Sequence, residues 1–321
     1  MDSAVPVSTG SRAPARSRLR RYRAGRDPRS RPHFSEIARW GLFILPALAL
    51  TGFFILYPAL GSLRYSLLDW AGYGPERYVG VDNFTELASD PLAWDAVLHS
   101  SLFALVTTVV EVTVGTAIAL ALDRKVFGHK TFKLLIFLPW ILPTAFVALS
   151  WANGYDPYFG WVVAITDLFG MEHAWLNDSH AVLFAVAIAP ILQSTGFVMI
   201  VVMGALGDVS SEIHEAATLD GVSEPQRARH VSLPLVRDAV ATMALLQFLW
   251  GFTNFDYVYI MTSGGPGTAS EVTSTFVYSQ AFENARFGYA CAAAVVTTVL
   301  MGAFAMFYTT LIRPRGISKA G

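Results

Sequence analysis

Charged residues are scarce in this chain. They make up 15% of its 321 residues, whereas hydrophobic residues make up 54%. Soluble globular domains carry about a quarter charged residues, so this composition excludes an ordinary soluble protein. Cysteine is nearly absent as well. Cys291 is the only one in the sequence, which excludes an intrachain disulfide.

Sequence signatures of catalysis and nucleotide binding are also missing. The chain has no G-x-x-x-x-G-K-[ST], no H-E-x-x-H, no G-x-S-x-G and no pair of cysteines. Its seven histidines are scattered and suggest no metal site. No internal repeat is visible, which weighs against a symmetric secondary carrier. We therefore expect a protein that is not an enzyme and that binds no cofactor or metal of its own.

Long apolar runs account for the hydrophobic excess. A helix needs about 20 residues to cross the hydrocarbon core of a membrane, and lipid offers the backbone no hydrogen-bond partners. Runs of this kind cover residues 38–62, 97–122, 132–152, 181–206, 235–261 and 286–312. The sequence predicts an all-α membrane protein with six transmembrane helices.

Basic residues predict how the chain is oriented. All of them lie before the first run, around the loops that follow runs two and four, or after run six, except Arg64, Arg77 and Arg286. Because basic loops stay in the cytoplasm, we expect a multi-pass membrane protein with both termini cytoplasmic. The expected order is a tail at 1–36, a first span within 37–68, an outer loop at 69–96, a core at 97–312 and a tail at 313–321.

The tail at 1–36 is rich in arginine, proline and serine, which predicts disorder. A nucleic-acid-binding arm is an alternative, but a basic tail before a first span is explained by orientation and by anionic lipid. Arg20 and Arg21 suggest a twin-arginine export signal. The apolar run starts far behind them with no small-residue cleavage site, so we expect an uncleaved first helix and no nucleic-acid partner.

A polar loop at 207–234 interrupts the apolar sequence. Asp208, Ser210 and Ser211 are candidate N-caps of a short helix whose small apolar stripe is Ile213, Ala216 and Ala217. Gly221 can end this helix, and Ser223 with Gln226 forms a capping box for a second helix that runs to Leu233-Pro234, where the chain turns into the fifth span. The alternative is a helix resting on lipid, which the small stripe disfavours.

The spacing of this loop resembles the EAA loop of permease subunits from binding-protein-dependent ABC importers. The matching residues are Glu215, Ala216, Ala217, Gly221, Val231, Leu233 and Pro234. Val231 replaces the usual isoleucine, and Pro225, Ala228 and Arg229 stand where relatives often carry aromatic residues. Segments 78–84, 254–266 and 276–290 extend the resemblance toward the maltose and glycerol-3-phosphate branch.

This resemblance implies the type I importer permease fold in the bacterial plasma (inner) membrane, with a coupling helix that docks on an ATPase subunit. Its coupling residues would be Glu215, Ala216, Ala217, Asp220, Gly221, Leu233 and Pro234. The implied partners are a second, similar permease, two ATP-binding subunits that hold ATP and Mg, an extracytoplasmic solute-binding protein and a carbohydrate or polyol. Glycerol-3-phosphate or a glycerophosphodiester is an alternative solute. An ion-coupled secondary carrier and a membrane enzyme are alternatives of other classes.

Polar residues inside the spans are candidates for the solute pathway, because they are costly to bury in a membrane. Asp256 lies with Asn254, Tyr257 and Trp250 near the outer end of span five, a set suited to sugar hydroxyls and rings. Bonding of Asp256 to backbone or to a neighbouring helix is the alternative.

Span four carries Pro190 ahead of Gln193, Ser194 and Gly196, which predicts a broken helix that lines the pathway or else a packing kink. Pro139 and Pro143 predict a bend in span three.

Two further features leave their roles open. Glu111 in span two is expected to bond between helices rather than to solute. Trp140, Trp151 and Trp161 are either interface anchors or platforms for sugar rings.

Overall fold

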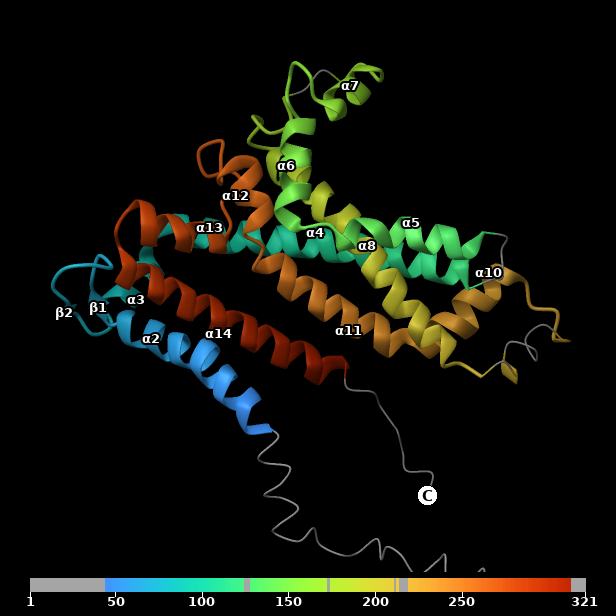
Figure 1. The fold of residues 1–321 in the computed structure, drawn as a ribbon, viewed down its shortest axis with the longest axis horizontal. Coiled ribbons are helices and arrows are strands. Elements are labelled where there is room, and N and C mark those ends of the chain that lie inside the picture. The colour runs from blue at the N-terminus through green and yellow to red at the C-terminus, as the bar shows by residue number, and fades with distance from the viewer. Residues whose placement is uncertain (1–43, 124–127, 172–173, 211, 214–218, 313–321) are drawn as a thin grey trace, which may run out of the picture. The chain divides into compact units, whose positions relative to one another are not determined.

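A computed structural model describes residues 44–123, 128–171, 174–210, 212–213 and 219–312 (Figure 1). The tails at 1–36 and 313–321 and the loop residues Glu215, Ala216 and Ala217 lie outside these ranges. The chain divides into two units, residues 1–59 and 60–321, which we describe separately.

The described part of the first unit is helical. Its residues belong to the helix Ile44–Tyr65, which includes a π-helical turn at Gly52–Leu56 and continues as α2 (Tyr57–Tyr65). Phe53, Phe54 and Ile55 are each more than 60% exposed. Exposed apolar side chains on a long apolar helix are expected to face lipid or a partner protein.

The second unit contains the remaining elements. After α2 come a short antiparallel pair, β1 (Leu68–Asp69) and β2 (Arg77–Tyr78), then α3 (Asp82–Ser89) and α4 (Pro91–Leu122). They are followed by α5 (His129–Ile141), α6 (Thr144–Gly154), α7 (Trp161–Asp167), α8 (Val182–Gly207), α10 (Glu224–Arg227), α11 (Leu233–Phe252), α12 (Asp256–Thr262), α13 (Thr273–Tyr278) and α14 (Phe287–Ile312).

Five helices among the described residues are long and apolar enough to span a membrane. They are Ile44–Tyr65, Pro91–Leu122, Val182–Gly207, Glu224–Thr262 and Phe287–Leu311. A sixth span forms if the bent pair α5 and α6 counts as one crossing, in agreement with the expected six. The second span begins at Pro91, earlier than the sequence predicts, because Asp90 caps the helix by accepting a hydrogen bond from the Leu92 amide.

The predicted bend in span three is confirmed. Helices α5 and α6 meet at 92°, and Figure 1 shows α6 turning sharply away from α5. Leu142, which precedes Pro143, has the extended conformation that a following proline favours, with ψ of 142°. Pro143 then precedes the first residue of α6, where its missing N–H costs no helical hydrogen bond.

The predicted break in span four is wrong. Helix α8 runs through Pro190 to Gly207 without interruption. The break lies instead in span five, where residues 253–255 separate α11 from α12. The expected turn at Leu233-Pro234 is also wrong. Helical residues continue from Glu224 to Phe252, since a π-helical turn at Ala228–Ser232 joins α10 to α11. Pro234 has no N–H to donate, and the helix departs from α-helical bonding in the π-helical turn just before it.

Small residues allow the long helices to approach closely. A Cβ atom on Gly115 of α4 would lie 2.7 Å from Val198 of α8, and one on Gly251 of α11 would lie 2.9 Å from Ala104 of α4. Membrane helices depend on such small residues because lipid supplies no hydrophobic drive for association. Helix α4 therefore packs directly on both α8 and α11.

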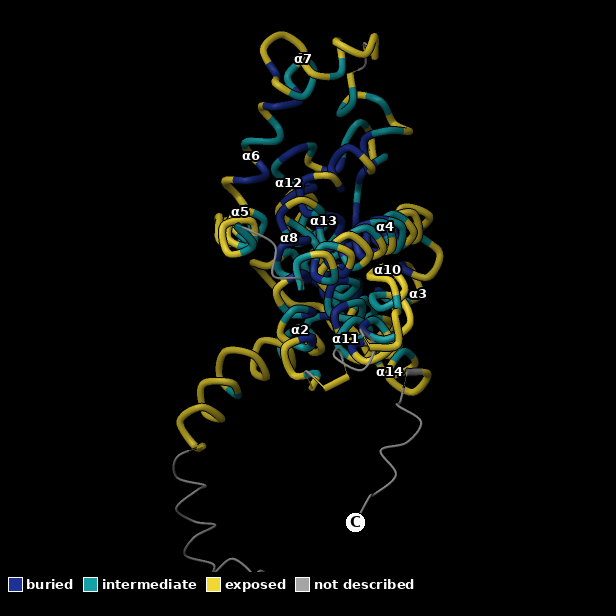
Figure 2. Tube along the Cα trace, turned by 90° about the vertical axis from the view of Figure 1, so that its right-hand side faces the viewer, coloured by how far each residue is buried: buried dark blue, intermediate teal, exposed yellow. Residues whose placement is uncertain are grey.

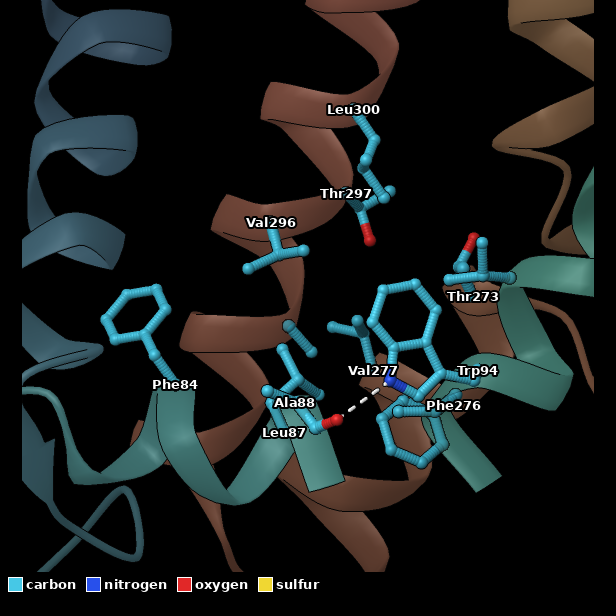
Figure 3. Close-up of a pocket in the computed structure, with 13 residues that line it drawn as sticks. Phe84, Leu87, Ala88, Trp94, Thr273, Phe276, Val277, Val296, Thr297 and Leu300 are labelled. Atoms are coloured by element: carbon cyan, nitrogen blue, oxygen red, sulfur yellow. Dashed lines mark hydrogen bonds between the residues drawn. The ribbon is translucent and has the colours of Figure 1, made fainter. Parts of the chain in front are cut away.

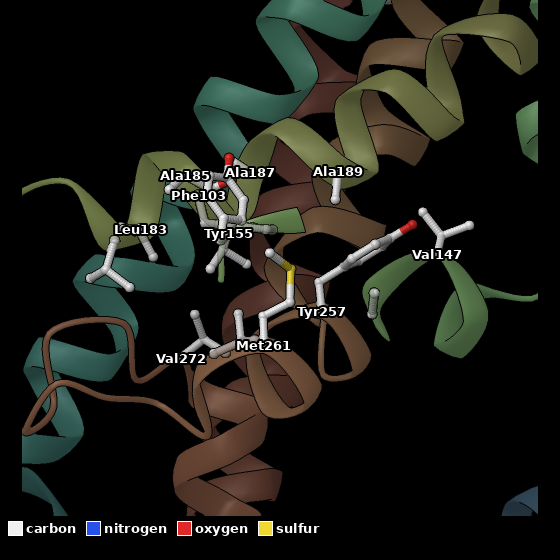
Figure 4. Close-up of a cluster of buried hydrophobic side chains, with 14 residues drawn as sticks. Phe103, Val147, Tyr155, Leu183, Ala185, Ala187, Ala189, Tyr257, Met261 and Val272 are labelled. Carbon is white, nitrogen blue, oxygen red and sulfur yellow. The ribbon is translucent and has the colours of Figure 1, made fainter. Parts of the chain in front are cut away.

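The largest buried cluster lies where α4, α6, α8 and α12 meet. Figure 4 shows Tyr257 of α12 reaching toward Val147 of α6, with Phe103 of α4 in the same cluster. Figure 2 shows burial concentrated around α4, α8 and α12. This cluster fixes the position of α12 just beyond the break in span five.

Candidate functional site

A polar cavity opens at the break in span five. Its volume is about 420 Å³, and its walls come from α4, the corner between α5 and α6, α8, α11, α12 and residues 253–255. The polar residues that line it include Glu111, Gln193, Gln247, Asn254, Asp256 and Tyr257. Non-helical backbone at membrane depth is tolerated where it lines such a cavity.

Side chains from neighbouring elements hold the broken segment. The Asn254 carbonyl accepts a hydrogen bond from Ser274 Oγ at 2.6 Å, and Asn254 Oδ1 accepts one from the Tyr257 amide at 3.3 Å. These bonds replace helical partners that the break removes. Asn254 thus connects α13, the break and the first turn of α12.

A carboxyl and an amide form one wall of the cavity. Gln247 Nε2 of α11 donates a hydrogen bond to Glu111 Oε2 of α4 at 2.5 Å. Glu111 is 3% exposed and Gln247 2%. The predicted bond between helices at Glu111 is therefore confirmed, and Glu111 also lines the cavity. Gln247 Oε1 is buried and has no hydrogen-bond partner among the described residues.

Gln193 of α8, which also lines the cavity, is hydrogen-bonded to two other elements. Its Nε2 donates to the Leu142 carbonyl at 2.8 Å, at the corner between α5 and α6. Its Oε1 accepts a hydrogen bond from the Tyr257 hydroxyl of α12. Both ends of the Gln193 amide are thus engaged by the protein.

Aromatic rings make the apolar wall. Trp140 stacks on Phe197, with centroids 4.3 Å apart and planes 14° apart, and lies 5.9 Å from Trp250. Trp140 and Trp250 both line the cavity, and Trp250 is 46% exposed. Trp151 and Trp161 pack on each other, with centroids 4.9 Å apart, and are not among the residues that line this cavity.

The structure brings most of the candidate pathway residues together. Asp256, Asn254, Tyr257, Trp250, Gln193 and Ser194 all line the cavity. Gly196 does not. Gly196 follows Gln193 by one helical turn in α8. A Cβ atom on Gly196 would lie 2.2 Å from the Ile136 carbonyl oxygen, so Gly196 contacts α5 instead of the cavity. Gln247 also lines the cavity but was not predicted as a pathway residue, although a glutamine within an apolar span indicates such a role.

The polar loop is described in part. Gly221 has a left-handed conformation with φ of +70°, and Asp220 beside it is exposed. Gln226 Oε1 accepts hydrogen bonds from the Ser223 amide at 3.1 Å and from its hydroxyl at 2.7 Å, so the predicted capping pair is present. Leu219 is 89% exposed.

Leu233 and Pro234 begin α11. Leu233 is half-buried and Pro234 is exposed. Glu215, Ala216 and Ala217 lie outside the described residues. Within the described ranges, no group of three or more His, Cys, Asp or Glu side chains could hold a metal ion.

A second, smaller cavity is apolar. It has a volume of about 100 Å³ and lies between α3, α4, α13 and α14 (Figure 3). Trp94 lines it and donates its indole N–H to the Ala88 carbonyl at 3.0 Å, as the dashed line in Figure 3 marks. Leu87, Phe276 and Val296 complete walls that offer few polar atoms to a hydroxylated solute.

The arrangement of helices matches a solved structure. The structure of a bacterial ABC transporter involved in the import of the acidic polysaccharide alginate matches this chain with a TM-score of 0.76 at 21% sequence identity, covering 89% of this chain and 99% of the other. This similarity assigns the fold class, which is the type I ABC importer permease fold.

Sequence comparison gives the family. Residues 111–317 match the model of the binding-protein-dependent transport system inner membrane component, and the chain belongs to this family. A probable ABC transporter permease protein, YurN of Bacillus subtilis, is 31% identical over 265 residues, 81% of this chain and 90% of that protein. The diacetylchitobiose uptake system permease protein NgcF of Streptomyces coelicolor is 28% identical, covering 95% of this chain and 90% of that protein.

Proposed function

We propose that this chain is a permease subunit that carries a carbohydrate or related polyol across the plasma membrane through the polar cavity at the break in span five. The cavity carries this proposal. It places carboxyl and amide groups beside the rings of Trp140 and Trp250, which is the combination that binds hydroxyls and the apolar faces of sugar rings. Named relatives import sugars, among them diacetylchitobiose.

Transport requires the cavity to open on each side of the membrane in turn. We infer that ATP closes a pair of partner ATPase subunits and that the loop at 207–234 transmits this movement to the spans. Exposure of Leu219 and Asp220 next to Gly221 supports a docking role for this loop. A second permease subunit would supply the other half of the pathway, and an extracytoplasmic binding protein would deliver the solute. Both termini would be cytoplasmic.

The role of the cavity is tested by changing Asp256 to alanine. We expect Asp256→Ala to raise the KM for uptake by about tenfold, because a hydrogen bond between a solute and a charged group contributes about 1.5–3 kcal/mol. Initial uptake rates in proteoliposomes that contain the complete transporter provide the measurement. Asp95→Asn, which changes an exposed carboxyl on α4 that does not line the cavity, is the control. An unchanged KM in Asp256→Ala would remove this side chain from the solute pathway.

A secondary carrier is distinguished by its energy source. If this chain is driven by an ion gradient, uptake continues without the ATPase subunits. We expect uptake to stop when the ATPase subunits are omitted and to be unaffected by an ionophore. The same assay with glycerol-3-phosphate as solute tests the alternative substrate class.

A further inference from the structure

The charged group that the polar cavity presents is a carboxylate. Asp256 lines the cavity and is exposed in it. Glu111, a second carboxyl group that lines the cavity, is 3% exposed and accepts a hydrogen bond from Gln247.

The cavity offers neutral hydrogen-bonding groups but no positive charge. The Gln193 and Gln247 amides and the Tyr257 hydroxyl donate to protein groups, and Asn254, Ser194 and Thr144 also line the cavity. No lysine, arginine or histidine is among the described residues that line the cavity. An anionic group entering it would meet the Asp256 carboxylate without a positive charge to balance its own.

We propose that this half of the pathway selects solutes by charge: it accepts neutral or amino-bearing sugars and polyols and excludes those that carry a carboxylate, sulfonate or phosphate. Asp256 determines the charge preference, because its carboxylate is exposed in the cavity. This inference rests on the proposed function and narrows it to one class of solute. Two like charges about 8 Å apart in a partly buried site change a binding constant by about tenfold or more.

The charge preference is measurable without knowing the solute. Ser194 lines the cavity, and Cys291 is the only native cysteine of this chain, so Ser194→Cys in a Cys291→Ser background leaves this chain with one thiol. Labelling is measured on this chain after its separation from the other subunits. The complete transporter is treated with the cationic reagent methanethiosulfonate ethyltrimethylammonium and with the anionic reagent methanethiosulfonate ethylsulfonate. The ratio of the two rates is compared with the ratio for 2-mercaptoethanol.

We expect the cation-to-anion ratio at Ser194→Cys to exceed that of the free thiol by about tenfold. Adding Asp256→Asn lowers the ratio by severalfold, whereas adding Asp95→Asn leaves it unchanged. Each rate is divided by the rate of neutral methyl methanethiosulfonate with the same protein, because removal of a nearby carboxylate also changes the thiolate fraction. Reaction of all three proteins with this neutral reagent shows that the thiol is accessible. A ratio no higher than that of the free thiol, or one that Asp256→Asn does not lower, overturns the proposal.

Protection by solutes separates this inference from the proposed function. Neutral oligosaccharides, amino sugars and uronic acids are each tested for slowing the reaction of Ser194→Cys with the neutral reagent. Protection by neutral or amino sugars, but not by uronic acids, supports the proposal. Equal protection by uronic acids overturns the charge preference and leaves the proposed function standing. If none of the sugars protects the thiol, the proposed function fails and this inference fails with it.

Discussion

Gly196 and Gly204 both lie on α8, but only Gly196 is packed closely against another helix. A Cβ atom on Gly196 would lie 2.2 Å from the Ile136 carbonyl oxygen, whereas one on Gly204 would meet nothing within 4 Å. We expect Gly196→Ala to destabilise the protein by about 1–3 kcal/mol, the usual cost of overpacking, because backbone on α5 must move. Gly204→Ala should be neutral or stabilising by about 0.5–1 kcal/mol, since alanine favours a helix. Thermal unfolding of both variants in detergent makes the comparison, and equal unfolding temperatures would contradict it.

Burial raises the pKa of the Glu271 carboxyl, which lies in the loop between α12 and α13, outside the spanning helices. A carboxyl with a raised pKa penalises the folded state when it is ionised. Its effect on stability therefore appears as pH rises above its ordinary value of 4.5 and grows up to its raised pKa.

We expect Glu271→Gln to unfold at a higher temperature than the unchanged protein at pH 8, and the difference to shrink as pH falls toward 4.5. The backbone carbonyl of Glu271, which bonds to His99 Nδ1 at 3.0 Å, is unaffected by this change. Melting curves across the pH range provide the measurement. A difference that stays constant with pH would show that ionisation of this carboxyl is not involved.

Some residues that line the cavity were predictable because polar side chains are costly to insert into a membrane. Asp256 and Gln193 stand out in the sequence because apolar spans rarely carry such side chains. Their hydrogen-bond partners were not predictable, since the bond from Tyr257 to Gln193 joins residues far apart in the chain. Gly196 was assigned to the pathway from its neighbours in sequence, but its side of α8 faces α5.

Among the elements, the broken fifth span depends on a neighbour. The carbonyl of Asn254 lies in the break and accepts a hydrogen bond from Ser274 Oγ of α13 at 2.6 Å. We expect Ser274→Ala to destabilise the protein by about 1–3 kcal/mol, because it leaves a half-buried carbonyl without this donor. Ser89→Ala, which removes a hydroxyl bonded to carbonyls of its own helix α3, is the control. Equal melting temperatures for the two variants would show that α13 does not hold the break.

The break in span five was not predictable from the sequence. Proline is the strongest local signal of a helix break, and it pointed correctly to the bend at Pro143 but wrongly to span four. Residues 253–255 include neither proline nor glycine. Their break is held by contacts with α13 and by the cavity, which only the folded arrangement supplies.

At the scale of the whole molecule, the loop at 207–234 should link the cavity to the ATPase subunits. Gly221 and Gly170 form a matched pair for testing this link. Both are exposed, with φ of +70° and +69°, and neither would place a Cβ atom within 4 Å of another atom. Valine strains the backbone similarly at both positions. We expect Gly221→Val to reduce ATP-dependent uptake by at least about tenfold while membrane insertion is retained, and Gly170→Val to leave uptake largely intact. Equal effects would assign the loss to strain rather than to coupling.

The fold as a whole was predictable because the membrane limits the choices. The length of the apolar runs predicted the spans, and the EAA-like spacing predicted the family before any contact was known. The cavity required the structure, since its walls come from helices that are distant in sequence.

Alternating access through the polar cavity is tested most directly by labelling the cavity from each side of the membrane. The complete transporter carrying Ser194→Cys and Cys291→Ser is placed in proteoliposomes of known orientation and treated with a membrane-impermeant thiol reagent added to one side. We expect the thiol to react from the cytoplasmic side without nucleotide and from the outer side with a non-hydrolysable ATP analogue bound. Reaction from the same side in both states would contradict it.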